Sequence, residues 1–141
     1  MPLHLTALLQ SDEEGGRAVV ALWETCGLTR PWNPPEIDLA HALDNPTSTV
    51  FIARANSSAP IIGTVMAGFD GHRGWLYYLA VDPSAQRAGV ARALIDAAES
   101  WLAEQGARKV QLMVRSGNPA AGLYEHLGYE RQETAVYGRW L

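Results

Sequence analysis

The stretch from Leu79 to Leu94 limits what this chain can fold into more than any other part of it. It begins as an apolar strand that ends at Val81, passes through a turn containing Pro83, and opens at Gly89 into a helix. The first turn of a helix has unpaired backbone N–H groups and a partial positive charge, which together bind phosphate. The pattern therefore predicts a strand–loop–helix unit that holds a diphosphate just beyond the end of the strand.

The side chains of the loop favour the same interpretation. Ala88, Gly89 and Ala91 have no side chain large enough to keep a phosphate away from the backbone. Arg87 and Arg92 add charge-assisted hydrogen-bond donors. The loop lacks both the Lys-Ser/Thr pair of a Walker loop and the three glycines of a dinucleotide-binding fingerprint. A phosphate ligand of another kind is therefore expected.

Composition indicates a single globular domain over residues 1–141, with a hydrophobic fraction of 48% and a net charge of −4. An acidic chain without a basic stripe argues against nucleic acid as a partner. The single cysteine, Cys26, excludes an internal disulfide and fits a reducing cytoplasm. The histidines and the cysteine lack metal-ligand spacing, so no metal is expected. The N-terminal residues resemble neither a signal peptide nor a membrane span, so we expect a cytoplasmic protein with no membrane partner.

Hydrophobic periodicity and turn residues predict the element order β-α-α-β-β-β-α-β-α-β-β. A capping box at Ser11 begins the first helix, and Asn33 caps the second. Gly63 marks a bulge, and Gly106 ends the long helix over residues 90–105. Strands are expected at residues 3–9, 49–55, 61–69, 75–81, 109–114, 129–133 and 136–140, the last two as a hairpin, with a short helix at 119–127.

The motif Gln86-x-x-Gly89-x-Ala91, after the strand that ends at Val81, resembles the acyl-CoA pyrophosphate loop of the GNAT superfamily of N-acyltransferases. The element order resembles the GNAT fold over nearly the whole chain. This resemblance implies an α/β fold with a mixed, mostly antiparallel sheet flanked by helices, in which strands 75–81 and 109–114 splay apart to admit the pantetheine arm of acetyl-CoA. The implied cofactor-binding residues are Leu79, Ala80, Val81, Arg87, Ala88, Gly89, Val90, Ala91 and Arg92.

A second motif runs from Asn118 through Ala120 and Tyr124 to Gly128 and resembles the pattern Asn-x-x-Ala-x-x-x-Tyr-x-x-x-Gly-Phe/Tyr of RimI-like acetyltransferases. The resemblance implies that the Tyr124 hydroxyl protonates the leaving thiolate and that Asn118 belongs to the cofactor site. Asn118 stands one residue closer to Tyr124 than the family pattern has it. The alternative role of Tyr124 is a core aromatic residue that packs the helix on the sheet.

A narrower resemblance, to YpeA-type bacterial acetyltransferases, rests on segments 22–24, 30–33, 63–66, 70–74 and 77–79. In the family fold the loop between the first two helices and the start of the strand at 75–81 line a groove for the acceptor. The Glu base that RimI-type enzymes place near this point is replaced by Arg73, so no general base is carried over. Trp32 could offer a flat face to an acceptor cation or pack the start of a helix, and Arg30 could bind a carboxylate or pair with Glu36. His72 could be a base, but a lone histidine in a loop is more often simply solvated. The implied acceptor-site residues are Arg30, Trp32, Asn33, Asp70, His72 and Tyr78.

Together these features predict an acetyl-CoA-dependent N-acetyltransferase. It would transfer acetyl to a primary amine, on a small molecule or at a protein N-terminus or Lys, by direct attack on the thioester. The alternative is a non-catalytic acyl-CoA-binding regulatory module of the same fold. Tyr124 beside an intact loop favours the enzyme, while the unassigned base favours the module. The expected partner is the amine acceptor, and a homodimer is left open.

Overall fold

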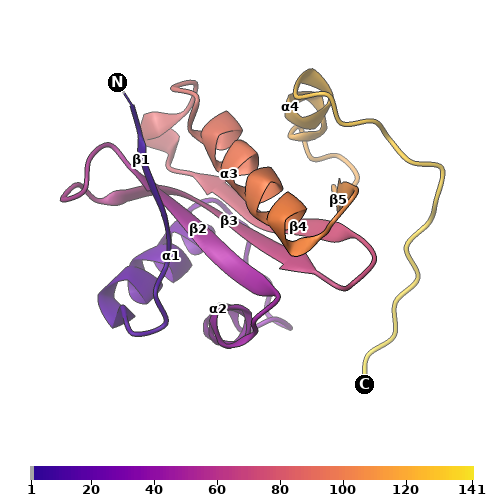
Figure 1. Ribbon diagram of the computed structural model, residues 1–141, viewed down its shortest axis with the longest axis horizontal. Helices are drawn as coiled ribbons and strands as arrows, with labels where there is room; N and C mark the ends of the chain where they lie inside the picture. The colour runs from indigo at the N-terminus through magenta and orange to yellow at the C-terminus, as the bar shows by residue number, and fades with distance from the viewer. Residues whose placement is uncertain (1) are drawn as a thin grey trace.

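Within residues 2–141, which the computed structural model describes, the chain forms a five-stranded sheet in the order β1-β2-β3-β4-β5. The strands are β1 (His4–Ala7), β2 (Ser48–Arg54), β3 (Ile61–Phe69), β4 (Gly74–Val81) and β5 (Val110–Leu112). Neighbouring strands from β1 to β4 run antiparallel, while β4 and β5 run parallel. The predicted α/β fold with a mixed, mostly antiparallel sheet is therefore confirmed (Figure 1).

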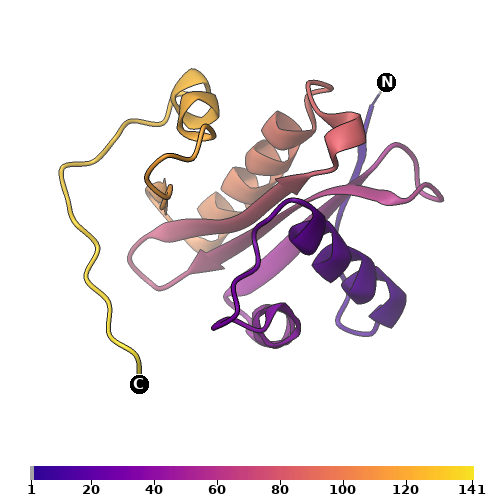
Figure 2. The same cartoon turned by 180° about the vertical axis from the view of Figure 1, so that it is seen from behind.

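Helices cover both faces of this sheet. They are α1 (Glu13–Thr25), α2 (Pro35–Asp44), α3 (Val90–Gln105) and the short α4 (Ala121–His126). In one layer, α1 packs on β3 and β4 and α2 packs on β2, while α3 packs across β1 to β4 in the other. Figure 1 shows α3 in front of the sheet, and Figure 2 shows α1 and α2 from behind. Each face of the sheet therefore has its own apolar core.

The long helix lies where the sequence predicts it, from Val90 to a left-handed Gly106. It can approach the sheet closely because β3 has a glycine beneath it. A Cβ atom at Gly63 would lie only 2.7 Å from Val90 Cγ1 and 2.9 Å from Leu94 Cδ1. The β2–β3 register also shifts beside this residue, so the predicted bulge is confirmed. Gly63 thus brings the start of α3 against the sheet.

Two predicted helix caps are wrong. The cap of α1 is Asp12, whose carboxylate accepts a hydrogen bond from the Gly15 amide at 2.9 Å, rather than Ser11. Asp12 takes this role because it stands three residues before an amide that the helix leaves unpaired. The residue that precedes α2 is Pro34, without a side-chain cap, rather than Asn33. Asn33 instead closes a tight turn by donating its backbone N–H to the Arg30 carbonyl at 3.0 Å.

The predicted C-terminal hairpin is also wrong, because no strand follows α4 within the described residues. Residues 130–141 are exposed throughout, and none of their backbone groups makes a hydrogen bond to another backbone group. β5 is likewise shorter than predicted. The two-residue link Thr134-Ala135 offers a physical reason, because tight hairpin turns require residues that accept positive φ, such as Asn or Gly.

No helix in residues 2–141 combines the length and the apolar character needed to cross a bilayer. The same residues contain no group of three or more His, Cys, Asp or Glu side chains placed to hold a metal ion.

Candidate functional site

The backbone is irregular in the middle of β4. Thr64 pairs with Ala80 and Met66 pairs with Tyr77, so β4 has one extra residue over this interval. Tyr78 adopts φ 53°, in the left-handed region. That conformation costs a residue other than glycine roughly 1–2 kcal/mol. The bulge persists only because surrounding contacts hold it.

Contacts from three other elements hold Tyr78. Its ring stacks on the Trp23 indole of α1, with centroids 3.8 Å apart and an interplanar angle of 11°. The indole Nε1 donates to Thr64 Oγ1 at 2.9 Å, and the Thr64 hydroxyl donates to the Tyr78 carbonyl at 3.1 Å. Trp23 and Thr64 are both fully buried. The bulge is therefore fixed by a continuous network through α1 and β3.

The fourth contact of this network reaches α2. The Tyr78 hydroxyl donates to Asp38 Oδ2 at 2.6 Å. Burial, together with the hydrogen bond to the Asp38 carboxylate, raises the pKa of the Tyr78 phenol. This role of Asp38 could not be predicted from the sequence, because a single acidic residue on a helix has no distinctive pattern. Only the packing of α2 beside the bulge could identify it.

Beyond the bulge, β4 separates from β5. The parallel pairing covers only Gly74, Trp75 and Leu76, opposite residues 110–112, and stops short of Tyr78. A bulge increases the local twist of its strand, which accounts for the separation. The predicted splay of these strands is thus confirmed. The edge that Leu79 and Ala80 present toward β5 has no strand partner in the described structure. The Val81 carbonyl is partly engaged, since it accepts a hydrogen bond from the Cys26 thiol at 3.4 Å.

The loop between β4 and α3 follows directly from this free edge. Asp82 caps a short turn by accepting from the Ser84 amide at 2.9 Å and from its hydroxyl at 2.7 Å, and these hydrogen bonds lower the pKa of Asp82. Arg87 and Gly89 both have positive φ. A Cβ atom at Gly89 would meet nothing within 4 Å, so the space before α3 is open. The predicted phosphate loop therefore stands at the end of β4, with its arginines exposed.

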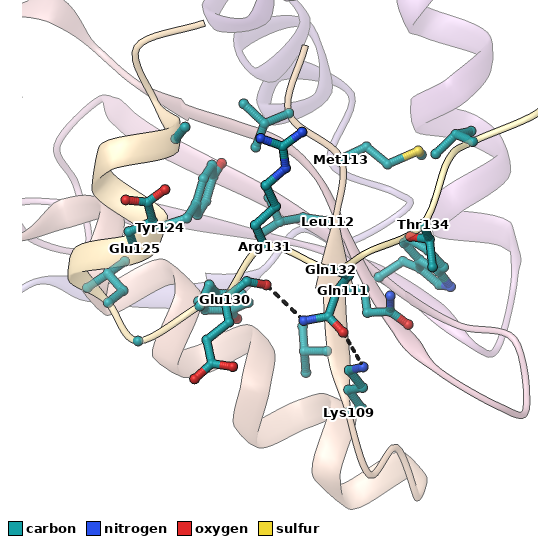
Figure 3. A pocket seen from close by; sticks show the side chains of 18 of the residues that line it. Lys109, Gln111, Leu112, Met113, Tyr124, Glu125, Glu130, Arg131, Gln132 and Thr134 are labelled. Atoms are coloured by element: carbon teal, nitrogen blue, oxygen red, sulfur yellow. Dashed lines mark hydrogen bonds between the residues drawn. The ribbon is translucent and has the colours of Figure 1, made fainter. Parts of the chain in front are cut away.

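Tyr124 lies on the opposite side of the splay, in α4. It lines a cavity of about 930 Å³ bounded by α4, β5, the end of α3 and residues 128–136 (Figure 3). Its ring meets the Tyr129 ring edge-on at 6.1 Å, and burial raises the pKa of its phenol. Asn118 lines the same cavity, and its side chain accepts from the Ala120 amide at 2.9 Å. Tyr124 and Asn118, the two residues of the second motif that the resemblance assigns to the site, thus line the same cavity.

Five of the six residues predicted for the acceptor site lie in two separate loops, and the sixth, Tyr78, lies in β4. Arg30 donates to the carbonyls of Gly27 and Thr29 at 2.9 and 2.8 Å, and not to Glu36. Trp32 is 54% exposed, so a large part of its indole is open to solvent. No hydrogen bond among the described residues joins this loop to the loop of Asp70 and His72.

In the second loop, Asp70 organises its own neighbours. Its carboxylate accepts from the amides of His72 and Arg73 at 2.8 and 2.7 Å and from Trp75 Nε1 at 3.2 Å. The hydrogen bonds from Arg73 and His72 lower the pKa of Asp70. The Asp70 carboxylate is therefore committed to shaping the turn, and His72 remains exposed on it.

Comparison with known proteins decides the family. The model of the acetyltransferase (GNAT) family matches residues 17–129. Acetyltransferase YE1169 of Yersinia enterocolitica is 42% identical over 140 residues, which cover 99% of this chain and 96% of that protein. The chain belongs to the GNAT acetyltransferase family. The family that the Gln86–Ala91 motif suggested is thus confirmed.

Solved structures show the same GNAT fold. The aminoglycoside acetyltransferase AAC(6')-Iy, in complex with the bisubstrate analogue CoA-S-monomethyl-acetylneamine, has a TM-score of 0.80 at 20% identity, covering 100% of this chain and 99% of its own. A ribosomal-protein-alanine N-acetyltransferase from Brucella melitensis has a TM-score of 0.75 at 20% identity, covering 99% and 100%. These structural likenesses establish the fold that the sequence predicted. At 20% identity they do not identify the acceptor of this protein.

Proposed function

We propose that this protein transfers the acetyl group of acetyl-CoA to a primary amine by direct attack on the thioester. The observation that carries the proposal is the β4 bulge at Tyr78, with a free strand edge beside it and an open helix-start loop after it. This arrangement offers one continuous run of backbone donors and acceptors. A ligand with both amides and a diphosphate, as acetyl-CoA has, suits such a run.

Acetyl-CoA would lie along this run in one direction. Its diphosphate accepts hydrogen bonds from the amides between Arg87 and Arg92, where the partial positive charge of α3 is concentrated. Its pantetheine amides pair with the free edge at Leu79 and Ala80, as an added strand does. The bound bisubstrate analogue of the related AAC(6')-Iy supports a CoA-type ligand for this fold.

The chemistry needs a proton donor for the sulfur. The neutral amine attacks the thioester carbonyl carbon, and a backbone N–H at the bulge stabilises the oxyanion. When the C–S bond breaks, the electron pair goes to sulfur and the Tyr124 phenol donates its proton to the thiolate. Because burial raises the pKa of Tyr124, the phenol is protonated before the step. The attacking nitrogen releases its own proton to water, and solvent restores the proton of Tyr124.

The acceptor is proposed to be an amine that arrives as a cation, drawn in by Asp38, and that loses one proton to water before it attacks as the neutral amine. This carboxylate lies at the bulge through its hydrogen bond with Tyr78. Carboxylates near a reaction centre raise the local concentration of positively charged substrates. Asp38→Asn keeps the size of the side chain and its hydrogen-bonding oxygen but removes the charge. It should raise the KM of the amine several-fold, while the Kd of acetyl-CoA in calorimetry stays the same.

An acceptor screen tests the proposal. Purified protein is incubated with acetyl-CoA and a panel of aminoglycosides, polyamines and peptides with a free N-terminal alanine. Free CoA is followed with a thiol reagent, corrected for Cys26 by a sample without acceptor, and acetylated products are identified by mass spectrometry. Acceptor-dependent release of CoA is the expected result. Tight acetyl-CoA binding with no release on any amine would favour the non-catalytic module, for which the Arg73 found in place of a base is the one supporting observation.

A further inference from the structure

Strand β4 presents three aromatic side chains on one face of the sheet. Gly74 and Leu76 face α3, because a Cβ atom at Gly74 would lie 2.9 Å from a side-chain atom of that helix and Leu76 belongs to the core beneath it. Side chains alternate along a strand, so Trp75 and Tyr77 face the side of α1 and α2. The extra residue of the bulge turns Tyr78 to the same side, where its ring stacks on α1. Trp75, Tyr77 and Tyr78 together are called the aromatic strip.

The helices cover only one end of the aromatic strip. α1 covers Tyr78 through the stacked ring of Trp23, whereas α2 packs on β2. The Tyr77 side chain is 42% exposed, and Trp75 is half-buried. Gly68, which pairs with Trp75, adds no side chain to this part of the sheet. In Figure 2 the end of the β3–β4 hairpin extends past both helices. Aromatic surface therefore continues from the bulge toward the β3–β4 loop.

A carboxylate lies at each end of the aromatic strip. At the bulge, Asp38 Oδ2 accepts the hydrogen bond of the Tyr78 hydroxyl at 2.6 Å. At the loop, Asp70 Oδ2 accepts from Trp75 Nε1 at 3.2 Å and keeps a lone pair for another donor. Hydrogen bonds from two backbone N–H groups of its own loop lower the pKa of Asp70, so this carboxylate is ionised at neutral pH. Burial and then the charge of Asp70 raise the pKa of the Tyr77 phenol, so the negative charge acts on the middle of the strip.

The basic residue of the same loop interacts elsewhere. The Arg73 guanidinium donates to the His72 carbonyl at 3.2 Å, while only the Arg73 backbone N–H donates to Asp70. Two carboxylates separated by aromatic rings complement a ligand with a positive charge at each end, because both carboxylates and the faces of aromatic rings attract cations.

We propose that the acceptor is an aliphatic diamine that lies along the aromatic strip. One amine reacts at the bulge near Asp38, while the second, as an ammonium, binds Asp70 Oδ2 and the face of the Tyr77 ring. Trp75 and Tyr78 are three residues apart, which is about 10 Å along a strand and suits a chain of several methylene groups. This inference rests on the proposed function and adds the class of acceptor to it.

The polar atoms of the strip favour a hydrocarbon chain between the two charges. Trp75 Nε1 and the Tyr78 hydroxyl are already paired with carboxylates, which leaves the Tyr77 hydroxyl. A ligand with many hydroxyl groups would lose hydrogen bonds to water on this surface and regain few of them. Methylene groups lose none, and they remove apolar ring surface from water.

Kinetics with matched amines test the inference. Putrescine, cadaverine and hexamethylenediamine are compared with butylamine, pentylamine and hexylamine, which have the same carbon chains and one amine. The best diamine should exceed its matched monoamine in kcat/KM by roughly tenfold or more. Asp70→Asn should remove most of this difference by raising the KM of the diamine, with the KM of the monoamine and the Kd of acetyl-CoA unchanged.

Two further variants complete the design. Tyr77→Leu removes the ring without touching the hydrogen bonds of Asp70, and it should reduce the preference for the diamine several-fold. Asp96→Asn is the matched control, because Asp96 is an exposed carboxylate on α3, across the sheet from the strip, and it should retain the full preference. Circular dichroism verifies that each variant is folded, and Tyr77→Leu decides by the same criterion if Asp70→Asn is not.

The outcomes separate this inference from the proposed function. Equal kcat/KM for diamines and monoamines would overturn the diamine and leave an amine acetyltransferase. A preference that survives in folded Asp70→Asn, or acetylation of aminoglycosides or alanyl peptides but not of diamines, would overturn it in the same way. No acceptor-dependent release of CoA with any amine would overturn the proposed function and the diamine with it.

Discussion

The two strands that flank the candidate site are held in very different ways. β4 is fixed around its bulge by the Trp23 ring, the Thr64 hydroxyl and the Asp38 carboxylate, with Trp23 and Thr64 fully buried. β5 is only three residues long, pairs with one neighbour, and leads to a helix of six residues and then to an exposed segment. The proposed cofactor site is built mainly on the first strand, and Tyr124 depends on the second.

This difference suggests that the two halves of the site are organised to different degrees before any ligand binds. Local stability follows buried contacts and protected hydrogen bonds, and both are concentrated around β4. The bulge and the α3 loop should therefore be preformed for acetyl-CoA. The position of Tyr124 relative to the thioester should depend more on what covers β5. Four predictions test this division, beginning with the largest expected effect.

Trp23→Ala should lower the free energy of unfolding by about 3–5 kcal/mol, because it leaves a cavity under the bulge and removes the ring stacked on Tyr78. Urea denaturation measures the loss. Trp32→Ala is the matched control, since Trp32 is 54% exposed and its removal should change stability by less than about 0.5 kcal/mol. Equal losses in the two variants would mean that the β4 network is not a special source of stability.

Gly89→Glu should weaken acetyl-CoA binding by roughly 100-fold or more, which corresponds to about 2.7 kcal/mol. The substitution places bulk and negative charge where the diphosphate should lie, at a residue with φ +79°. Calorimetry measures the affinity. Gly71→Glu introduces the same charge and a similar strain at φ +91° in the β3–β4 loop and should leave the affinity unchanged. Unchanged affinity in Gly89→Glu would refute the loop assignment.

Tyr124→Phe should lower kcat by roughly ten- to a thousand-fold, with acetyl-CoA affinity and melting temperature nearly unchanged, because only the proton donor is lost. Steady-state kinetics with the best acceptor measures the effect. Tyr129→Phe is the companion control. It removes the hydroxyl that donates to Glu99, so it should lower stability by about 1 kcal/mol and leave kcat almost intact. Normal turnover in Tyr124→Phe would make Tyr124 a packing residue.

The smallest effect is expected from Trp32→Ala in kinetic measurements. If the exposed indole binds the acceptor cation, the acceptor KM should rise several-fold while kcat and the Kd of acetyl-CoA stay the same, as when uniform ground-state binding is removed. The melting temperature should hardly change. An unchanged KM of the acceptor would mean that Trp32 does not bind it, and Asp38 and Tyr78 would then remain as the candidate acceptor-site residues.

Local patterns predicted local structure well. The bounds of β3 and α3 agree with the predicted residues 61–69 and 90–105, because each element has a regular apolar period and ends in turn residues or a glycine. The loop that ends at Gly89 could be predicted equally well, because its small residues and its glycine favour one backbone conformation. The helix caps were less reliable, because Ser11 and Asp12 are both good capping residues and only the geometry of the first turn selects between them.

The contacts that shape the site could not be predicted in the same way. Tyr78 meets Asp38 forty residues away, and Trp23 meets Thr64 across forty-one. No local preference specifies such pairs, because they form only when α1 and α2 pack on the sheet. The final hairpin failed for the opposite reason. Residues 129–140 have strand-like composition, but a strand needs a partner edge and a turn that leads to it.

By itself, then, the sequence determined the family, the order of elements to the end of α4, and the loop that should receive a diphosphate, because short-range periodicity and turn chemistry specify these features. Tertiary structure alone decided the left-handed bulge at Tyr78, the role of Asp38 and the open edge of β5. Each of these depends on which distant surfaces meet. Burial and hydrogen bonding across the whole fold stabilise a strained residue such as Tyr78 and leave an apolar segment such as residues 136–141 without a strand partner among the described residues.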